Sequence, residues 1–210
     1  MEISEIITAI GVIIMGWFAY NQKTKDKMTD LKIKMIENDA QRKSRRRSRN
    51  SAKIYGEIWE LLHYLNADRV YIIQPYPLDK NHYISIEYEV TRKGITGMKE
   101  YVYKIPMSQM AVFSRDMSEN QFLYISNINE QVKDKKAQAL LSSNGGYAAI
   151  IKRMTDGTHD WIGSIICEFT HKIEISEEEA RKLLRNAATN IQYILPEYHD
   201  PEDLSNENSI

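Results

Sequence analysis

The chain has 210 residues, of which 42% are hydrophobic and 27% are charged, and its formal net charge is −1 at pH 7. These values are ordinary for a globular protein, and the length suits one domain of about 150 residues with an additional N-terminal segment. The single cysteine, Cys167, excludes an intramolecular disulfide. The near-zero net charge conceals a basic segment, 23–53, and an acidic C-terminus.

The first 22 residues are the most apolar part of the chain. No charged side chain occurs between Glu5 and Lys23. At roughly 1.5 Å per residue, about 17 residues reach about 26 Å, just short of the ~30 Å hydrocarbon core of a bilayer. We therefore expect residues 1–22 to form a short transmembrane anchor that ends in an aromatic belt. The residues expected in the membrane are Ile6, Ile10, Ile13, Ile14, Trp17, Phe18 and Tyr20.

The charges that flank this segment predict its orientation. Acidic residues precede it and lysines follow it, so we expect a single-pass membrane protein with its C-terminal domain in the cytoplasm. Two alternatives stay open. A cleaved signal peptide is disfavoured because its first residues would be basic, whereas a helix buried in protein suits the marginal length.

Residues 23–50 are expected to form a basic helical stalk, because neither proline nor glycine occurs between Gly16 and Gly56. Apolar residues recur in it at coiled-coil spacing for little more than one heptad: Met28, Leu31 and Met35. This short repeat predicts weak pairing. The expected partner is a second copy of the chain, bound through the N-terminal helix and the stalk.

The densest positive charge lies at the end of the stalk, in residues 42–49. Such a block binds anionic lipids or nucleic acid, or else it is a solvated helix surface. An upright helix would place Arg45 roughly 35 Å beyond the anchor, far outside a Debye length of about 8 Å. Nucleic acid is not favoured, because no aromatic residue interleaves the arginines. The candidate anion-binding residues are Arg42, Arg45, Arg46, Arg47 and Arg49.

From residue 51 the pattern becomes that of a mixed domain. Residues 51–66 form an amphipathic helix, with large apolar residues at spacings of three and four. β-Branched and aromatic runs bounded by turn residues predict strands, and the second of these places Ile84, Ile86, Tyr88 and Val90 on one face. The predicted strands are 69–74, 83–90, 101–105, 122–125, 147–154 and 161–169, the last two joined by a hairpin turn at Asp156 and Gly157.

The remaining helices lie between and after these strands. We expect a short helix within 107–120 and another helix over 132–142. Ser176 begins the last helix, since Glu179 three residues later completes a capping box. Residues 196–210 are polar and acidic, and we expect them to form a disordered tail.

The order of these elements resembles that of a GAF-type domain, over residues 51–195. The residues that carry the resemblance are 54–62 with 67–73, 147–151 with 156–166 including Gly163, and 175–179. The resemblance implies an α+β fold with an antiparallel sheet of about five or six strands. The helices 51–66 and 176–195 would pack on one face, and GAF domains often dimerise through these two helices.

The resemblance also implies a small-molecule site on the other face of the sheet, beneath residues 104–145. The candidate ligand-binding residues are Tyr71, Tyr88, Tyr103, Met107, Phe113 and Trp161. The alternative is that these side chains only pack the sheet. The sequence names no cofactor.

No catalytic or metal-binding constellation is evident. None of the five histidines has metal-ligand spacing with another histidine or with the cysteine. Cys167 lies in the middle of a predicted strand, where a buried apolar role is expected rather than a reactive thiol or a bilin attachment. No run resembles the cyclic-nucleotide motif of some GAF domains.

These observations lead to one main functional expectation and two alternatives. The main expectation is a membrane-anchored cytoplasmic GAF-like module that senses a ligand or binds a protein without catalysis. One alternative is a phage-type membrane protein, holin-like or virion-associated. The other is a nucleic-acid-binding assembly protein that uses the arginine block.

Overall fold

The structure is a computed structural model that describes residues 3–76 and 82–195. Within the first 30 residues it describes the side chains of 17, 22, 25 and 27–29 only. The chain divides into two compact units, Met1–Ser48 and Arg49–Ile210. The expected acidic tail, 196–210, lies outside the described residues.

Helix α1 confirms the helix expected for the stalk and for the start of the domain. It extends without a break over Ile3–Tyr64. Just after it, Asn66 adopts a φ of +56°, a left-handed conformation that typically ends a helix. The amide of Ala67 donates to the carbonyl of Leu62 at 3.1 Å across this turn, which directs the chain into the first strand.

The predicted membrane anchor is wrong. Among the described residues, no helix combines the length and the apolar character that a membrane crossing requires. The physical reason is that an uncharged run of about 26 Å falls short of the ~30 Å core. The correction removes the single-pass topology and the orientation inferred from it. Of the residues expected in the membrane, only Trp17 has a described side chain, which is 63% exposed. The side chains of Ile6, Ile10, Ile13, Ile14, Phe18 and Tyr20 lie outside the described part.

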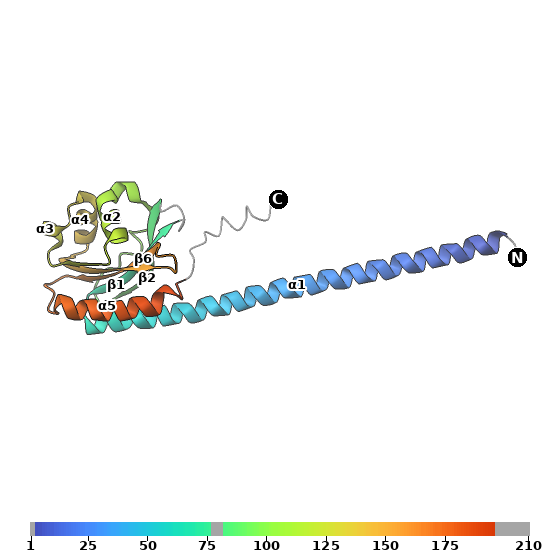
Figure 1. The fold of residues 1–210 in the computed structure, drawn as a ribbon, viewed down its shortest axis with the longest axis horizontal. Helices are drawn as coiled ribbons and strands as arrows, with labels where there is room; N and C mark the ends of the chain where they lie inside the picture. The colour runs from blue at the N-terminus through green and yellow to red at the C-terminus, as the bar shows by residue number, and fades with distance from the viewer. Residues whose placement is uncertain (1–2, 77–81, 196–210) are drawn as a thin grey trace. The chain divides into compact units, whose positions relative to one another are not determined.

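A six-stranded sheet forms the centre of the second unit, and Figure 1 shows it between two layers of helices. All neighbouring strands pair antiparallel, in the order β3-β2-β1-β6-β5-β4. The expected α+β fold and the hairpin of the last two strands are thereby confirmed. The strands are β1 (Arg69–Tyr76), β2 (Tyr83–Thr91), β3 (Ile105–Pro106), β4 (Phe122–Ile125), β5 (Ala148–Thr155) and β6 (Trp161–Phe169).

Each face of the sheet has its own apolar core, because side chains alternate between the faces along a strand. In β1, Val70 and Ile72 pack beneath the end of α1 and beneath α5 (Glu177–Gln192), whereas Tyr71 and Ile73 pack beneath the helices on the opposite face of the sheet. This is the arrangement that the resemblance implies. The remaining helices are η1 (Met107–Met110), α2 (Ala111–Glu119), α3 (Ile128–Gln131), α4 (Lys135–Ser143) and α5 (Glu177–Gln192).

Two strand predictions differ from the structure. The expected strand 101–105 shrinks to β3, because the amide of Val102 donates to the carbonyl of Met98 in a turn and Lys104 has a φ of +48°. In β2 the pairing with β1 shifts between Ile72 and Ile73. This bulge reverses the alternation. Ile84 and Ile86 therefore face the α2 side, whereas Tyr88 and Val90 face α1 and α5.

The helix predictions near the C-terminus are closer to the structure. The expected helix 132–142 begins later, at Lys135, because the carboxylate of Asp134 caps it. The short helix α3 before it was not expected. The predicted cap of α5 is confirmed, since the amide of Glu179 donates to the hydroxyl of Ser176 at 3.3 Å.

Candidate functional site

A cavity of about 200 Å³ lies between α2, β4 and the segment that joins α3 to α4. Apolar side chains form one part of its wall, and charged or amide side chains form the other. The apolar part comprises Val112, Phe113, Leu123, Ile125 and Val132, with Tyr124 beside them. The polar part comprises Asp116, Gln131, Lys133 and Asp134.

The local sequence explains why these side chains meet. In α2, Phe113 and Met117 are four residues apart and face the core, which places Val112 and Asp116 side by side on the neighbouring stripe. The carboxylate of Asp134 accepts hydrogen bonds from the amides of Lys136 at 3.1 Å and Ala137 at 3.3 Å. The cap therefore holds this wall of the cavity in place.

The charges at the cavity favour a ligand with a hydrogen-bond donor or a positive charge. Asp116 and Asp134 contribute two carboxylates, and Lys133 contributes one ammonium group. The ion pair of Asp116 with Arg115 is long, at 3.7 Å, and the two side chains are 39% and 60% exposed. Such a pair is worth little in water, so it does not compete strongly for the Asp116 carboxylate.

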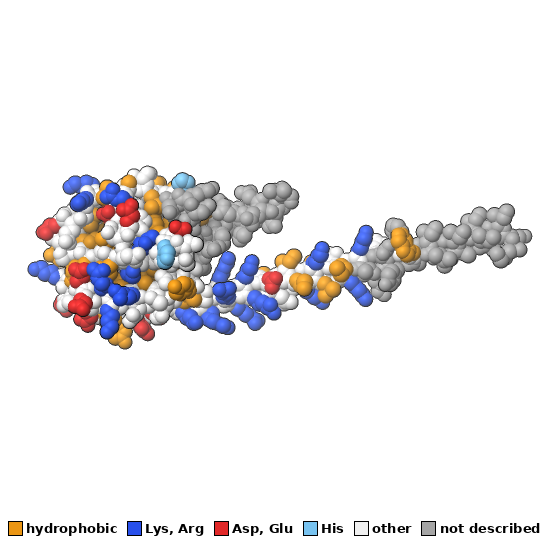
Figure 2. All heavy atoms as spheres, viewed as in Figure 1, with side chains coloured by type: hydrophobic (Ala, Val, Ile, Leu, Met, Phe, Trp, Pro, Cys, Tyr) orange, Lys and Arg blue, Asp and Glu red, His pale blue; other side chains and the backbone are white. Residues whose placement is uncertain are grey.

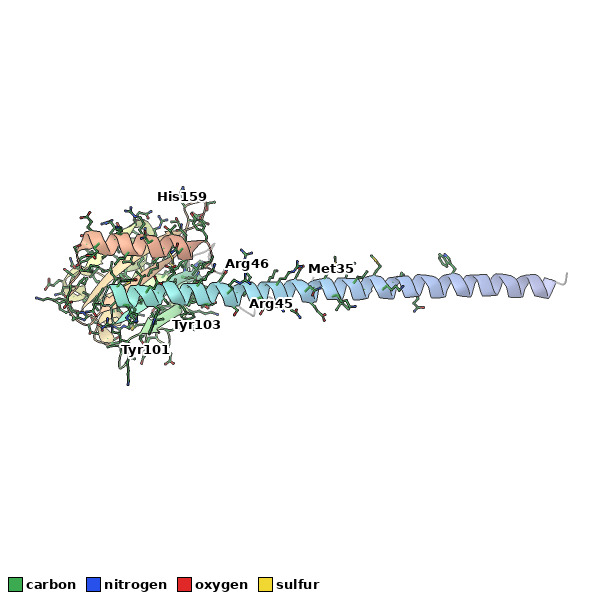
Figure 3. The ribbon with its side chains drawn as sticks, turned by 90° about the horizontal axis from the view of Figure 1, so that it is seen from below. Met35, Arg45, Arg46, Tyr101, Tyr103 and His159 are labelled. Atoms are coloured by element: carbon green, nitrogen blue, oxygen red, sulfur yellow. The ribbon has the colours of Figure 1, made fainter. Side chains whose placement is uncertain are left out.

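The structure separates the six predicted ligand-binding residues. Phe113 lines the cavity. Tyr71, Met107 and Trp161 pack in the core on the same side of the sheet, but they do not line the cavity. The other two residues do not line the cavity either. The β2 bulge turns Tyr88 toward α1 and α5, and Tyr103 is 60% exposed (Figure 3).

Sequence reasoning missed most of the cavity. Asp116, Val132 and Asp134 were not among the candidates. The available signal was Asp134 itself, an aspartate directly before a helix-forming run. Because the predicted helix began at 132, Asp134 was not recognised as its cap. The polar segment that precedes α4 and faces α2 was therefore missed as well.

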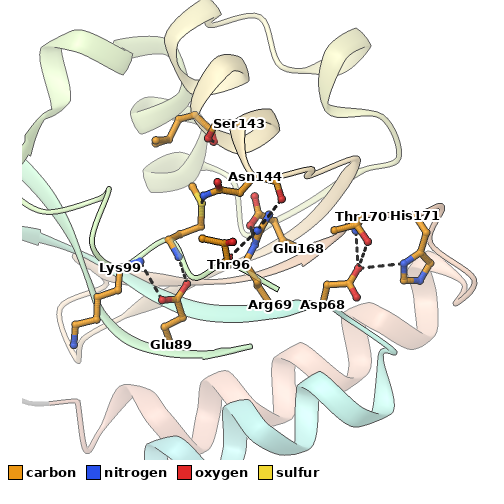
Figure 4. Close-up of polar contacts among 12 residues, drawn as sticks. Asp68, Arg69, Glu89, Thr96, Lys99, Ser143, Asn144, Glu168, Thr170 and His171 are labelled. Carbon is orange, nitrogen blue, oxygen red and sulfur yellow. Dashed lines mark hydrogen bonds and ion pairs between the residues drawn. The ribbon is translucent and has the colours of Figure 1, made fainter. Parts of the chain in front are cut away.

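A second group of polar side chains is buried at one end of β1 and β6 (Figure 4). The side chains of Arg69 and Glu168 are 0% exposed, and Nε of Arg69 donates to Oε2 of Glu168 at 2.7 Å. Nη1 of Arg69 also donates to the carbonyls of Thr96 at 3.0 Å and Asn144 at 3.1 Å. Within the described part of the chain, Nη2 of Arg69 and Oε1 of Glu168 have no hydrogen-bond partner.

The ionisation of this group reflects burial. Burial raises the pKa of Glu168 to about 7, although the adjacent Arg69 lowers it in part. Asp68 behaves in the opposite way. Burial would raise its pKa, but hydrogen bonds from the amide and hydroxyl of Thr170, both at 2.7 Å, and the nearby His171 lower it overall. These contacts join β1 to the residues after β6, which is a structural role.

Cys167 is fully buried in β6, in the core beneath α1 and α5. Burial raises the pKa of its thiol, which makes the thiol less reactive. Among the described residues, no three His, Cys, Asp or Glu side chains are grouped so that they could hold a metal ion.

The arginine block lies on α1, and its candidate residues Arg42, Arg45, Arg46, Arg47 and Arg49 are all exposed. Figure 3 shows Arg45 and Arg46 on the helix. No acidic residue stands three or four positions from Arg45, Arg46 or Arg47, where it could form an ion pair along the helix. Figure 2 shows the Lys and Arg side chains spread along this part of α1.

Comparisons with known proteins identify the fold. No family model matches the chain, and no curated protein does. The solved structures that match in fold include three GAF domains. The GAF3 domain of Slr1393 from Synechocystis sp. PCC6803, in its photoproduct state, has a TM-score of 0.57, at 12% identity over 77% of this chain and 99% of that chain. The fold is that of a GAF domain.

The other two structures are also GAF domains. The GAF domain of the cyanobacteriochrome TePixJ has a TM-score of 0.56, at 13% identity over 69% of this chain and 88% of that chain. The phycocyanobilin-bound GAF domain of a cyanobacterial phytochrome has a TM-score of 0.54, at 15% identity over 72% of this chain and 88% of that chain. At such identities the likeness concerns the fold alone.

Proposed function

We propose that the GAF-like domain is a non-catalytic sensor that binds a small molecule in the cavity between α2 and β4. The observation that carries the proposal is the combination of an apolar wall with a few fixed polar groups, which is typical of ligand sites. A volume of about 200 Å³ is below the ~300–1,000 Å³ of sites that hold drug-sized ligands. The ligand class is therefore a small, partly apolar molecule with an amine or another donor, not a tetrapyrrole.

The proposal predicts that filling the cavity abolishes the response to the ligand. A library of small amines and apolar alcohols is added to the full chain, and the melting temperature is measured. At a hundred times its Kd, a ligand adds about 2.7 kcal/mol, which corresponds to a rise of roughly 5 °C or more for a domain of this size. In Val132→Phe, where the new ring occupies the cavity, the rise should disappear.

The matched control is Val90→Phe, because Val90 packs in the core on the opposite face of the sheet. This variant should keep the full ligand response even if its melting temperature is lower. A library without any stabilising compound, or a compound that stabilises Val132→Phe as strongly as the unmodified chain, would refute the proposed site.

A second candidate function, nucleic-acid binding through α1, is supported by the exposed arginines without acidic neighbours. Binding to phosphates releases counterions, so the logarithm of the binding constant falls with the logarithm of salt concentration by about 0.9 per phosphate contact on duplex DNA. Changing Arg45, Arg46, Arg47 and Arg49 to glutamine should reduce this slope by roughly 3 to 4. Fluorescence anisotropy with a labelled duplex at several salt concentrations measures it.

The control for this second function is a variant in which Lys25, Lys27, Lys32 and Lys34, all exposed on the same helix, become glutamine. It removes the same charge from another part of α1. If both variants change the slope equally, the binding is not specific to the arginine block. The absence of measurable binding to the unmodified chain would exclude this function.

Self-association through α1 is part of the proposal. Met28, Leu31 and Met35 are each more than half exposed on the helix, at 55%, 58% and 69%. Continuing the same heptad positions leads to Arg42 and Arg45, which would face their own copies in a parallel pair and repel each other. The association is therefore confined to little more than one heptad, and we expect it to be weak.

A further inference from the structure

The side of β4 and β5 that faces α5 carries a group of cations. Phe122 and Lys152 are directly paired across the two strands. The guanidinium of Arg181 stacks over the Phe122 ring, 4.3 Å from the ring centroid. Arg185 follows Arg181 by one helical turn and is therefore on the same side of α5. Three cationic side chains thus converge from two elements of the fold.

The positive charge of this group is only partly neutralised. Nη2 of Arg181 forms an ion pair with Glu177 at 2.6 Å. Within the described part of the chain, Nζ of Lys152 has only neutral partners, the carbonyl and the side-chain oxygen of Gln121 at 3.1 and 3.2 Å.

The environment of Lys152 is unfavourable for its own charge. Burial lowers the pKa of Lys152, and Arg185, Arg153 and Arg181 lower it further. Every charged residue that shifts this pKa is therefore a cation. Perturbed ionisable groups that gather in this way are common at functional sites. A bound anion would relieve the repulsion among the cations and keep Lys152 protonated.

We propose that Lys152, Arg181 and Arg185 form a binding site for a phosphate group, carried by a small phosphate monoester or by inorganic phosphate. Arginine guanidinium groups bind phosphate oxygens through two parallel N–H bonds, and lysine adds a point charge. The stacking on Phe122 and the pairing with Glu177 hold Arg181 in position before an anion arrives.

The surroundings limit the size and charge of the anion. Arg181 and Arg185 also line an open groove of about 570 Å³ along α5, which gives access from solvent. Glu178 and Glu179 line the same groove, so a long polyanion would meet acidic groups beside the cations. Figure 2 shows blue and red side chains next to one another over the part of the domain where α5 lies. A single phosphate group fits this mixture better than nucleic acid does.

This site is separate from the proposed sensor cavity. Phe122 packs in the core beneath α1 and α5, whereas its neighbour Leu123 points to the opposite face and lines the cavity. The phosphate site therefore does not depend on the proposed function of the cavity, and either can fail without the other.

The test uses the full chain and inorganic phosphate, titrated calorimetrically at constant ionic strength. We expect saturable binding, with Kd raised at least about tenfold by Lys152→Gln and by Arg185→Gln, since a hydrogen bond to a charged group is worth roughly 1.5–3 kcal/mol. The control Lys93→Gln removes the same charge from an exposed position elsewhere and should leave Kd unchanged. Absence of saturable binding, or equal weakening by the control, would overturn the proposal.

A second measurement needs no variant. Acetic anhydride acetylates unprotonated amines, and the lowered pKa of Lys152 increases its unprotonated fraction. Mass spectrometry of the unmodified chain should therefore detect acetylation of Lys152. Bound phosphate should suppress the acetylation of Lys152 and not that of Lys93. Unchanged acetylation of Lys152 at saturating phosphate would contradict the site even if one of the variants failed to fold.

Discussion

Replacing Glu168 by methionine should lower the free energy of unfolding by about 3–5 kcal/mol, because it leaves the Arg69 guanidinium buried without its carboxylate. Replacing Arg69 by methionine should destabilise the domain less. The reason is that the charge left behind differs in its ability to be neutralised. Arginine stays protonated at any ordinary pH, whereas Glu168 can take up a proton and become neutral. Urea unfolding followed by circular dichroism measures both losses.

The double variant Arg69→Met/Glu168→Met completes the cycle. With both charges removed, an apolar pair of similar volume replaces the ion pair, and such replacements are often neutral or stabilising. The double variant should therefore be more stable than Glu168→Met alone, with a coupling energy of roughly 1–3 kcal/mol. Strictly additive losses would show that the two side chains do not interact as the 2.7 Å contact implies.

The same pair predicts how stability depends on pH. The pKa of Glu168 is raised from 4.5 to about 7 in the folded state, so the folded chain binds more protons than the unfolded chain between these values. The contribution of Glu168 to stability is therefore complete below about pH 4.5 and is lost as the pH rises through about 7. The loss is roughly 3 kcal/mol, at about 1.4 kcal/mol per pH unit. The double variant, which lacks the carboxyl, should not show it.

Asp68 opposes this trend at acidic pH. Its pKa is lowered in the folded state, so its contribution is present above its unfolded pKa and is lost as the pH falls through the folded value. Unfolding of the unmodified chain and of the double variant at pH 5 and pH 7.5 separates the two groups, because Asp68 remains ionised at both values. If the free energy of unfolding changes by the same amount between pH 5 and pH 7.5 in both chains, the raised pKa of Glu168 is not supported.

The sequence predicts the sheet and the helices that cover one of its faces because those signals are local. The apolar spacing of 51–66, the turn at Asp156 and the cap at Ser176 each depend on a few neighbouring residues. The run 101–105 fails because distant contacts decide its structure. The carboxylate of Glu89 accepts a hydrogen bond from the amide of Lys99 at 3.0 Å, and the hydroxyl of Ser85 accepts one from the amide of Lys104 at 2.8 Å.

The candidate site was less predictable for a related reason. Strict alternation along β2 would place Tyr88 on the same face as Ile86, and one bulge reverses this. A bulge depends on how two strands pair and has no reliable local signal. Phe113 was found because it is a large apolar residue in the region expected to cover the sheet. Asp116 and Asp134 form one polar wall only because the tertiary fold brings α2 next to the cap of α4, and this contact has no local sequence signal.

Replacing Gly163 by alanine should destabilise the domain by about 2–4 kcal/mol, through backbone strain and a steric clash. Gly163 has a φ of +154°, and a Cβ atom there would lie 2.7 Å from the carbonyl oxygen of Ile73 in β1. That oxygen belongs to the neighbouring strand of a buried sheet, so it cannot move aside without disturbing the pairing. The expected result is a clear fall in the urea midpoint with an unchanged slope.

Gly157 provides the control in the same hairpin. Nothing lies within 4 Å of a Cβ atom built there, so Gly157→Ala should change the free energy of unfolding by no more than about 0.5 kcal/mol. A small effect at Gly163, or a large one at Gly157, would contradict the close approach of β6 to β1. The contrast also explains the glycine on which the resemblance to GAF domains partly rested. At Gly163 the residue is required by the distance between two strands, whereas at Gly157 it only favours a turn.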